Sequence, residues 1–458
     1  MMPRASEHTD RDGRLKTAAR ESSVMGCADP ALPQLATLWN ADAMLDVLRS
    51  SLVDSSGADV ELRSCAIRRV RYRPGARSIV LYELDAGEPL HVTAITYADD
   101  RAAQQYNRIR QSLADESASG LPPYAHLEGL RALVQVYPYD RQLPSLPRVA
   151  AGTDRETLKI LDEACGGGET DWDITGARYR PMQGCTFRYR GGDPVRDLYV
   201  KVYRNEQEGR DAYATLRNLH ETVREARPGF HVVRPVGFCE ASRTLTVESA
   251  DGTAMPELLA GGGDPAELGQ RSARALRAFH ESRFACTTCW GPRHINERAE
   301  QAAALITIAC PELTDAINRI AETLRDYPSD FTARPSQLDP KPDHFFFEDE
   351  QVSFIDLDTF AAADPMFDAA FMFARMRALP DSDPSIAAES AAAAADAFLE
   401  RYLTLTSPGD AQRLAINHVY ALLQLALYAV RHQDHGWRDL ATARANAALA
   451  ECERVRRN

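Results

Sequence analysis

Alternation of apolar and polar residues predicts two strand-rich segments in the first half of the chain. In residues 35–150, an amphipathic helix around Leu38–Leu48 precedes strand-like runs, a polar helix over 99–113 and two further strands. Residues 155–260 repeat this order, with a longer helix over 206–221. The strand-like runs include CAIRRVRYR, SIVLYEL, HVTAITY and ALVQVYPYD in the first segment, and ITGARYRP, CTFRYRG, LYVKVYR, HVVRPVGFC and TLTVESADG in the second. The shared order indicates an internal repeat.

A short sequence match supports this repeat. Residues 71–74, Arg-Tyr-Arg-Pro, recur as residues 178–181, which lie 107 positions later. The same offset places Ala94 on Lys201. A four-residue match can arise by chance, but the agreement in element order favours duplication. An unrelated α/β accessory domain over 35–150 is the alternative.

The second half of the chain is predicted to be mainly helical. Apolar residues recur every three or four positions in LGQRSARALRAFHES, RAEQAAALITIA and TDAINRIAETL. Alanine-rich helices follow over 386–402 and 411–430, and a last helix lies near 439–455. Together with the strand-rich segments, these helices predict an α+β protein.

One acidic segment over 337–368, QLDPKPDHFFFEDEQVSFIDLDTFAAADPMFD, interrupts the helices. Two apolar runs, Phe345–Phe347 and Val352–Ile355, are separated by an acidic turn, a pattern typical of a β-hairpin. Asp339 precedes the first run and Asp356 follows the second. Because a hairpin returns its ends to one place, we expect the two carboxylates to lie near each other. One carboxylate can then accept a proton while the other holds a metal ion.

Composition narrows the possible functions. The 458 residues are 44% apolar and 26% charged, which is typical of a globular protein with two or three domains. The net charge of −13 argues against a nucleic-acid partner, which requires a basic face, and is compatible with a cationic substrate. Nine scattered cysteines fit reduced thiols better than a disulfide framework. The N-terminus has no apolar core, and the apolar run 421–430 is too short to span a membrane. We therefore expect a cytoplasmic protein without a membrane partner.

The acidic segment resembles the catalytic segment of the aminoglycoside phosphotransferase and choline kinase group, which has the protein-kinase-like fold. The family pattern is His-Gly-Asp, four residues, Asn, a hairpin, Ile-Asp-x-Asp and a later Asp-Pro-x-x-Asp. Asp339 matches the catalytic Asp, Asp356 matches the metal-binding Asp, and Asp364, Pro365 and Asp368 match the later motif. The residues that replace the family His, Gly and Asn are Gln337, Leu338 and His344. The chain therefore carries a variant of the family's catalytic loop.

The resemblance implies a bilobal protein-kinase-like fold. Residues 151–252 would form a small, antiparallel β-rich lobe that binds nucleotide, and residues 253–458 a large helical lobe with the catalytic hairpin. Residues 35–150 would then be a degenerate copy of the small lobe, kept for packing, substrate contact or dimerisation. We expect residues 1–34 to form a disordered arm.

The resemblance also implies a nucleotide site in the small lobe. Lys201, in the strand LYVKVYR, would hold the α- and β-phosphates of ATP or GTP as a point charge. A solvated strand lysine is the alternative. Other residues at nucleotide-binding positions are Glu206, Glu208 and Asp211 in the following helix, one of which would pair with the lysine, the glycine-poor loop Pro181–Cys185, and Glu248 and Ser249 at the hinge between the lobes.

In the catalytic segment, the resemblance makes Asp339 the general base for the substrate hydroxyl. Lys341 would steady the transferring phosphate or simply be exposed. Asp356 would hold Mg²⁺, and Asp358 would assist it or bond to backbone N–H groups. His344 is a poor replacement for an oxygen ligand of a second metal ion, so either one ion suffices, or His344 contacts a phosphate, or activity is lost.

Other candidate residues are given structural roles. Asp364 and Asp368 are expected to tie the catalytic loop to the next helix. Cys286 and Cys289 form a lone CxxC pair without the further ligands that zinc requires. His280 ends a helix among apolar neighbours and is expected to be a packing residue.

The resemblance thus implies a small-molecule kinase that transfers the γ-phosphate of ATP or GTP to a hydroxyl, with Mg²⁺ as cofactor. The alternative is a kinase-fold binding protein without phosphoryl transfer, which Gln337 and His344 favour. Retention of Lys201, Asp339 and Asp356 together favours the enzyme. Dimerisation through residues 35–150 is a further hypothesis.

Overall fold

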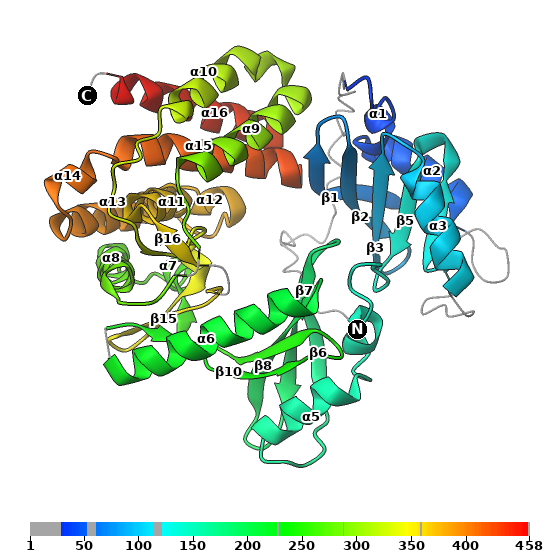
Figure 1. The fold of residues 1–458 in the computed structure, drawn as a ribbon, viewed down its shortest axis with the longest axis horizontal. Coiled ribbons are helices and arrows are strands. Elements are labelled where there is room, and N and C mark those ends of the chain that lie inside the picture. The colour runs from blue at the N-terminus through cyan, green and yellow to red at the C-terminus, as the bar shows by residue number, and fades with distance from the viewer. Residues whose placement is uncertain are drawn as a thin grey trace. The chain divides into compact units, whose positions relative to one another are not determined.

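A computed structural model describes the chain as two compact units (Figure 1). The described residues are 29–52, 61–112, 121–226, 229–286, 288–357 and 360–456. The first unit contains the described residues up to Gly209 together with 238–246 and 431–435, and the second contains the remainder. Most of the predicted N-terminal arm lies outside the described residues.

The first unit contains a five-stranded antiparallel sheet with the strand order β1-β2-β3-β5-β4. Its strands are β1 (Ser64–Arg73), β2 (Arg77–Asp85), β3 (Pro89–Tyr97), β4 (Tyr124–Leu127) and β5 (Ala132–Val136). Its helices are α1 (Leu35–Leu38), α2 (Ala41–Ser51), α3 (Arg101–Ser112) and the 3-10 helix Glu128–Leu130. Asn40 begins α2, because its side chain accepts hydrogen bonds from the N–H groups of Asp42 and Ala43. The indole of Trp39 donates to Ser78 (3.0 Å) and so ties these helices to β2.

A second sheet has the same strand order, β6-β7-β8-β11-β10. Its strands are β6 (Asp173–Arg180), β7 (Gly184–Gly191), β8 (Arg196–Tyr203), β10 (Pro235–Cys239) and β11 (Thr244–Glu248), preceded by α4 (Leu146–Ala150) and α5 (Arg155–Ala164). Paired positions across the first three strands are Arg71, Ile79 and Ile95 in the first sheet and Arg178, Thr186 and Lys201 in the second. Ile95, rather than Ala94, therefore occupies the place of Lys201, because one more residue separates the paired positions of β2 and β3. Neither residue supplies a positive charge.

Asp140 joins the turn after β6 to the first sheet. Its buried carboxylate accepts hydrogen bonds from the Tyr179 hydroxyl (2.9 Å) and the Met182 N–H (2.7 Å). Met182, within the predicted phosphate-covering loop, is buried in an apolar cluster with Ile79, Ile95, Tyr97, Ala102 and Leu133. The loop is therefore anchored by residues of the first sheet.

The second unit is mainly helical. Its helices are α6 (Glu206–Ala226), which begins in the first unit, α7 (Met255–Ala260), α8 (Pro265–Glu281), α9 (Pro292–Ala309), α10 (Thr314–Arg325), α11 (Pro365–Arg377), α12 (Leu379–Ser382), α13 (Ala388–Thr404), α14 (Pro408–Ala411), α15 (Leu414–His432) and α16 (Trp437–Val455). Two 3-10 helices cover Pro311–Leu313 and Pro342–His344. α8 packs closely against α13, because a Cβ on Gly269 would lie only 2.2 Å from the carbonyl oxygen of Ala394. Glycine is required at this crossing.

The predicted hairpin is confirmed. β14 (Phe345–Glu348) pairs antiparallel with β15 (Gln351–Phe354), inside a small sheet with β9 (His231–Val232) and β12 (Thr253–Ala254). Phe345 and Phe354 are fully buried and pack edge to face, with ring centroids 4.6 Å apart. With its sheets and helical unit, the fold is α+β, as the sequence predicts.

The expectation that no segment is long enough to span a membrane was too strict. Residues 408–432 are long and apolar enough by length and composition alone. However, 61% of the most apolar window of this segment is buried inside the protein, as in a core helix.

Candidate active site

A second strand pair closes the catalytic segment into one loop. β13 (Arg334–Ser336) pairs antiparallel with β16 (Ala361–Ala363), so Ser336 lies opposite Ala361. Asp339 and Asp356 both fall between these strands, one before and one after the hairpin. Both carboxylates lie close enough to His344 for their charges to act on its ring. The structure therefore brings together the two acidic ends of the hairpin.

Asp368, at the start of α11, holds the loop that carries Asp339. Its fully buried carboxylate accepts hydrogen bonds from the backbone N–H groups of Gln337 (2.5 Å) and Leu338 (2.9 Å). The Nε2 atom of His280 lies 3.1 Å from the same carboxylate, and its Nδ1 atom lies 2.6 Å from the hydroxyl of Tyr402. The predicted structural role of Asp368 thus has a geometric basis. His280 is more than a packing residue, because it links α8 and α13 to this loop.

The two replaced motif positions before Asp339 also have identifiable roles. Leu338 has a φ of +67°, a left-handed conformation that favours glycine, the residue that the family has there. The buried Gln337 amide donates a hydrogen bond to the carbonyl of Ile355 (3.0 Å). Gln337 thereby ties the start of the loop to the strand end that precedes Asp356.

Two cations hold the carboxylate of Asp339. Arg375 Nη2 lies 2.5 Å from Oδ1, and Lys341 Nζ lies 3.0 Å from Oδ2, while 51% of the Asp339 side chain stays exposed. Desolvation alone would raise the pKa of Asp339, but the positive charges of Arg375 and Lys341 outweigh it and lower the pKa. Arg375 was missed in the sequence, because it lies on α11, 36 residues away, and no local motif marks it.

His344 lies beside Asp356 at the other end of the hairpin. Its Nε2 atom is 3.7 Å from the Asp356 carboxylate, and its side chain is only 6% exposed. Burial, followed by the charge of Lys341, lowers the pKa of His344 to about 4. His344 is therefore neutral at physiological pH and acts as a buried neighbour of Asp356. Asp358 lies outside the described residues.

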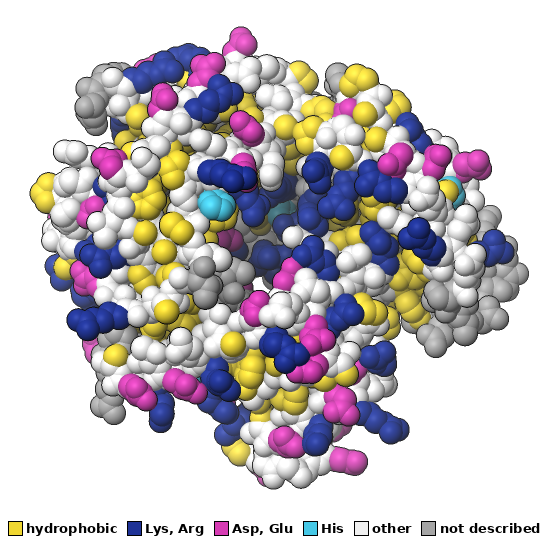
Figure 2. Space-filling view, in the orientation of Figure 1, with side chains coloured by type: hydrophobic (Ala, Val, Ile, Leu, Met, Phe, Trp, Pro, Cys, Tyr) yellow, Lys and Arg dark blue, Asp and Glu magenta, His cyan; other side chains and the backbone are white. Residues whose placement is uncertain are grey.

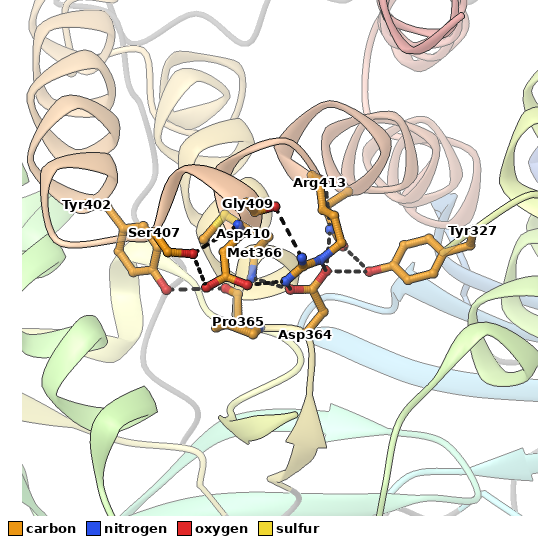
Figure 3. Close-up of polar contacts among 10 residues, drawn as sticks. Tyr327, Asp364, Pro365, Met366, Tyr402, Ser407, Gly409, Asp410 and Arg413 are labelled. Atoms are coloured by element: carbon orange, nitrogen blue, oxygen red, sulfur yellow. Dashed lines mark hydrogen bonds and ion pairs between the residues drawn. The ribbon is translucent and has the colours of Figure 1, made fainter. Parts of the chain in front are cut away.

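The Asp364 carboxylate is the centre of a buried polar network (Figure 3). It accepts hydrogen bonds from Arg413 Nε (2.9 Å) and Nη2 (3.1 Å), from Asn417 (3.2 Å) and from the Tyr327 hydroxyl (3.3 Å). Asp364 also begins α11, since its side chain accepts from the Met366 N–H. This network joins the segment just after α10 to the start of α11 and the start of α15.

In the second sheet, Lys201 lies near the C-terminal end of β8. Its cross-strand neighbour is Thr186 on β7, whose partner on β6 is Arg178. Directly paired residues of an antiparallel sheet point to the same face, so these three side chains share one face. This face is opposite the one that buries Cys185 and Val202.

The other residues at predicted nucleotide-binding positions have contacts of their own. Glu208 forms an ion pair with Arg204, four residues earlier, so it is a poor candidate for the acidic partner of Lys201. Asp211 is exposed on α6. The carboxylate of Glu248 pairs with Arg234 (3.0 Å), and the Ser249 hydroxyl donates to the carbonyl of Ala250 (3.3 Å).

The two thiols of the CxxC pair differ in exposure. Cys286 is partly buried, Cys289 is exposed, and burial raises the pKa of the Cys286 thiol. Among the described residues, no three His, Cys, Asp or Glu side chains are grouped so as to hold a metal ion.

Comparison with known proteins shows what the chain is similar to. Residues 183–415 match the model of the phosphotransferase enzyme family. Similar solved structures include the ADP-bound aminoglycoside phosphotransferase APH(2'')-Ib (14% identity, 66% of this chain and 99% of that chain, TM-score 0.42). They also include a choline/ethanolamine kinase family protein from Mesorhizobium loti (16%, 67% and 94%, TM-score 0.41) and a choline kinase from Cryptosporidium parvum (11%, 66% and 96%, TM-score 0.45). No curated protein matches the chain significantly.

Proposed function

Because the chain belongs to the phosphotransferase enzyme family, we propose that it transfers the γ-phosphoryl group of ATP or GTP to a hydroxyl group of a small molecule. One observation carries this proposal: Asp339 and Asp356 lie at the two ends of one hairpin, inside a loop closed by β13 and β16. Phosphoryl transfer requires a carboxylate for the incoming hydroxyl and a second for the metal ion that neutralises the phosphates.

Asp339 is proposed to orient the acceptor. Its half-exposed carboxylate can accept a hydrogen bond from a hydroxyl, while Arg375 and Lys341 fix its position. The transition state of phosphoryl transfer is loose, so positioning matters more than the basicity of this group. A lowered pKa is therefore compatible with the role, because it keeps Asp339 ionised over a wide pH range.

Asp356 is proposed to bind Mg²⁺. Mg²⁺ takes oxygen ligands and is usually held by only one or two protein carboxylates, with water and phosphate oxygens completing its shell. The donor set fits this habit, since Asp356 offers one carboxylate and Asp358 follows two residues later. Bound Mg²⁺ would neutralise charge on the nucleotide phosphates. The neutral, buried His344 fits a positioning role toward Asp356 better than that of a ligand.

One observation favours the alternative, a nucleotide-binding protein without phosphoryl transfer. The ion pair with Arg375 occupies an oxygen of Asp339 at 2.5 Å, and an acceptor hydroxyl must share or displace that contact. An assay of nucleotide hydrolysis distinguishes the two functions. Both require nucleotide binding, but only the phosphotransferase requires turnover of the nucleotide.

The test is Mg²⁺-dependent hydrolysis of ATP and GTP by the wild type, Asp339→Asn and Asp343→Asn. Asp343 is exposed and lies four residues after Asp339, so its variant controls for the loss of one negative charge in the same loop. We expect Asp339→Asn to lose activity by about 100-fold or more, and Asp343→Asn to keep it. Equal hydrolysis by the wild type and Asp339→Asn would show that the assignment is wrong. Thermal stabilisation by nucleotide without any turnover would establish the binding protein instead.

A further inference from the structure

The repeated Arg-Tyr-Arg sequence lies on β1 and β6, two strands of the first unit. Arg71 Nη1, on β1, donates a hydrogen bond to the carbonyl of Pro181, directly after β6 (3.3 Å). The Tyr179 hydroxyl, on β6, donates to Asp140, and its ring packs against Tyr137 with centroids 5.1 Å apart. The first contact joins the end of β6 to β1, and the other two join it to the segment after β5.

The arrangement concentrates positive charge. The positive charges of Arg71, Arg178, Arg180 and Arg431 all act on Arg69. Arg431 also acts on Arg71, where the carboxylate of Asp140 has the opposite effect. Burial, reinforced by the charges of Arg180, Arg431 and Arg178, lowers the pKa of Arg69 to about 10. Lys and Arg side chains also gather over β1 in Figure 2. In a chain of net charge −13, such a cluster is not a consequence of basic composition.

Two of these arginines keep unused hydrogen-bond donors. The Nε atoms of Arg69 and Arg180 are buried and have no hydrogen-bond partner among the described residues. A buried donor without a partner destabilises the protein, and clustered like charges add repulsion. A ligand that supplied oxygen acceptors and negative charge would remove both costs.

We propose that Arg69, Arg71, Arg178 and Arg180 bind a multiply charged anionic small molecule that carries phosphate or carboxylate groups. Guanidinium groups bind such oxyanions through paired N–H donors, and the placement of the four arginines on strands of two sheets restricts their movement before a ligand binds. Arg178 also shares its sheet face with Lys201, two strands away. The ligand predicted by this cluster is anionic, whereas the acidic net charge alone favours a cationic one. The site itself does not depend on phosphoryl transfer.

Isothermal titration calorimetry of the full chain tests this site, without nucleotide or metal and at low salt. The probes are inorganic pyrophosphate for phosphate chemistry and citrate for carboxylate chemistry. The variants are Arg69→Gln and Arg180→Gln, with Arg110→Gln as control, because Arg110 is exposed on α3 and its loss changes the net charge equally. Lys201→Met tests whether a probe binds at the nucleotide position instead.

We expect at least one probe to bind the wild type, and its affinity to fall about tenfold or more in Arg69→Gln and Arg180→Gln but less than twofold in Arg110→Gln. The probe that binds identifies the chemistry. Without ligand, the melting temperature of Arg69→Gln should equal or exceed that of the wild type, because one repelling charge is gone. The proposal fails if neither probe binds, if Arg110→Gln weakens binding equally, or if only Lys201→Met does. A lower melting temperature of Arg69→Gln with unchanged affinity would assign Arg69 a purely structural role. That result would also overturn the proposal.

Discussion

Replacement of Asp368 by Asn is expected to destabilise the protein far more than its small change in shape suggests. The carboxylate is fully buried and accepts from two backbone N–H groups, those of Gln337 and Leu338, with His280 as a third neighbour. Asparagine keeps one acceptor oxygen and places an NH₂ group where the other stood. One N–H group of the catalytic loop would then face a donor.

The expected cost follows from these contacts. Loss of one hydrogen bond to a charged acceptor costs about 1.5–3 kcal/mol, and a buried N–H group left without an acceptor costs about 1–3 kcal/mol more. We therefore expect the free energy of unfolding to fall by about 2.5–6 kcal/mol, a large part of the roughly 5–15 kcal/mol typical of a domain. Because the same N–H groups position the loop of Asp339, hydrolysis of ATP or GTP should fall as well.

Urea unfolding followed by circular dichroism measures the change in stability. Asp396→Asn is the matched control, because Asp396 is 59% exposed on α13 and pairs with Arg377 at the surface (2.7 Å). Such exposed pairs contribute about 0–1 kcal/mol. If Asp368→Asn lowered the free energy of unfolding by no more than the Asp396→Asn control, the reasoning that Asp368 holds the catalytic loop would be refuted.

Three further predictions concern residues near the hairpin and the helical unit. In Arg375→Gln, loss of a positive charge should raise the pKa of Asp339, so the acidic limb of the pH–rate profile should move to higher pH; an unchanged limb would exclude Asp339 as the titrating group. Gly252→Ala should cost about 2–4 kcal/mol in urea unfolding, because Gly252 has a φ of +90° and an added Cβ would lie 2.3 Å from the carbonyl oxygen of Phe347; Gly291→Ala, with open space around its Cβ, should cost under 1 kcal/mol, and equal costs would contradict this. Arg413→Met should cost about 3–5 kcal/mol, because it leaves the buried carboxylate of Asp364 without its cation; a cost below 1 kcal/mol would show that the network is not stabilising.

Features set by neighbouring residues could be predicted from the sequence. The hairpin could be predicted, because its strands and turn lie within ten residues. Two apolar runs bounded by acidic residues are compatible with few other local structures. Most helices could, because their apolar spacing reflects burial against one face. The repeated element order was also visible, and the two sheets have the same strand order.

The supporting contacts could not be predicted, because they join residues that are distant in the sequence. His280 meets Asp368 and Tyr402 across 88 and 122 residues, and Arg375 reaches Asp339 across 36. The left-handed backbone of Leu338 gave no signal either, since leucine is not typical of that conformation. The repeated Arg-Tyr-Arg sequence indicated only a duplication. The alternation of residues along one strand does not show which distant segment lies near it, so the arginine cluster could not be predicted.

The most direct test of the central claim is the Mg²⁺ dependence of nucleotide affinity, measured by isothermal titration calorimetry in the wild type, Asp339→Asn and Asp356→Asn. In the proposed function, Asp356 binds the metal ion and Asp339 orients the acceptor. We therefore expect Mg²⁺ to strengthen nucleotide binding in the wild type and in Asp339→Asn, and this strengthening to fall about tenfold or more in Asp356→Asn. Equal Mg²⁺ dependence in Asp356→Asn and the wild type would contradict the assignment of the two carboxylates.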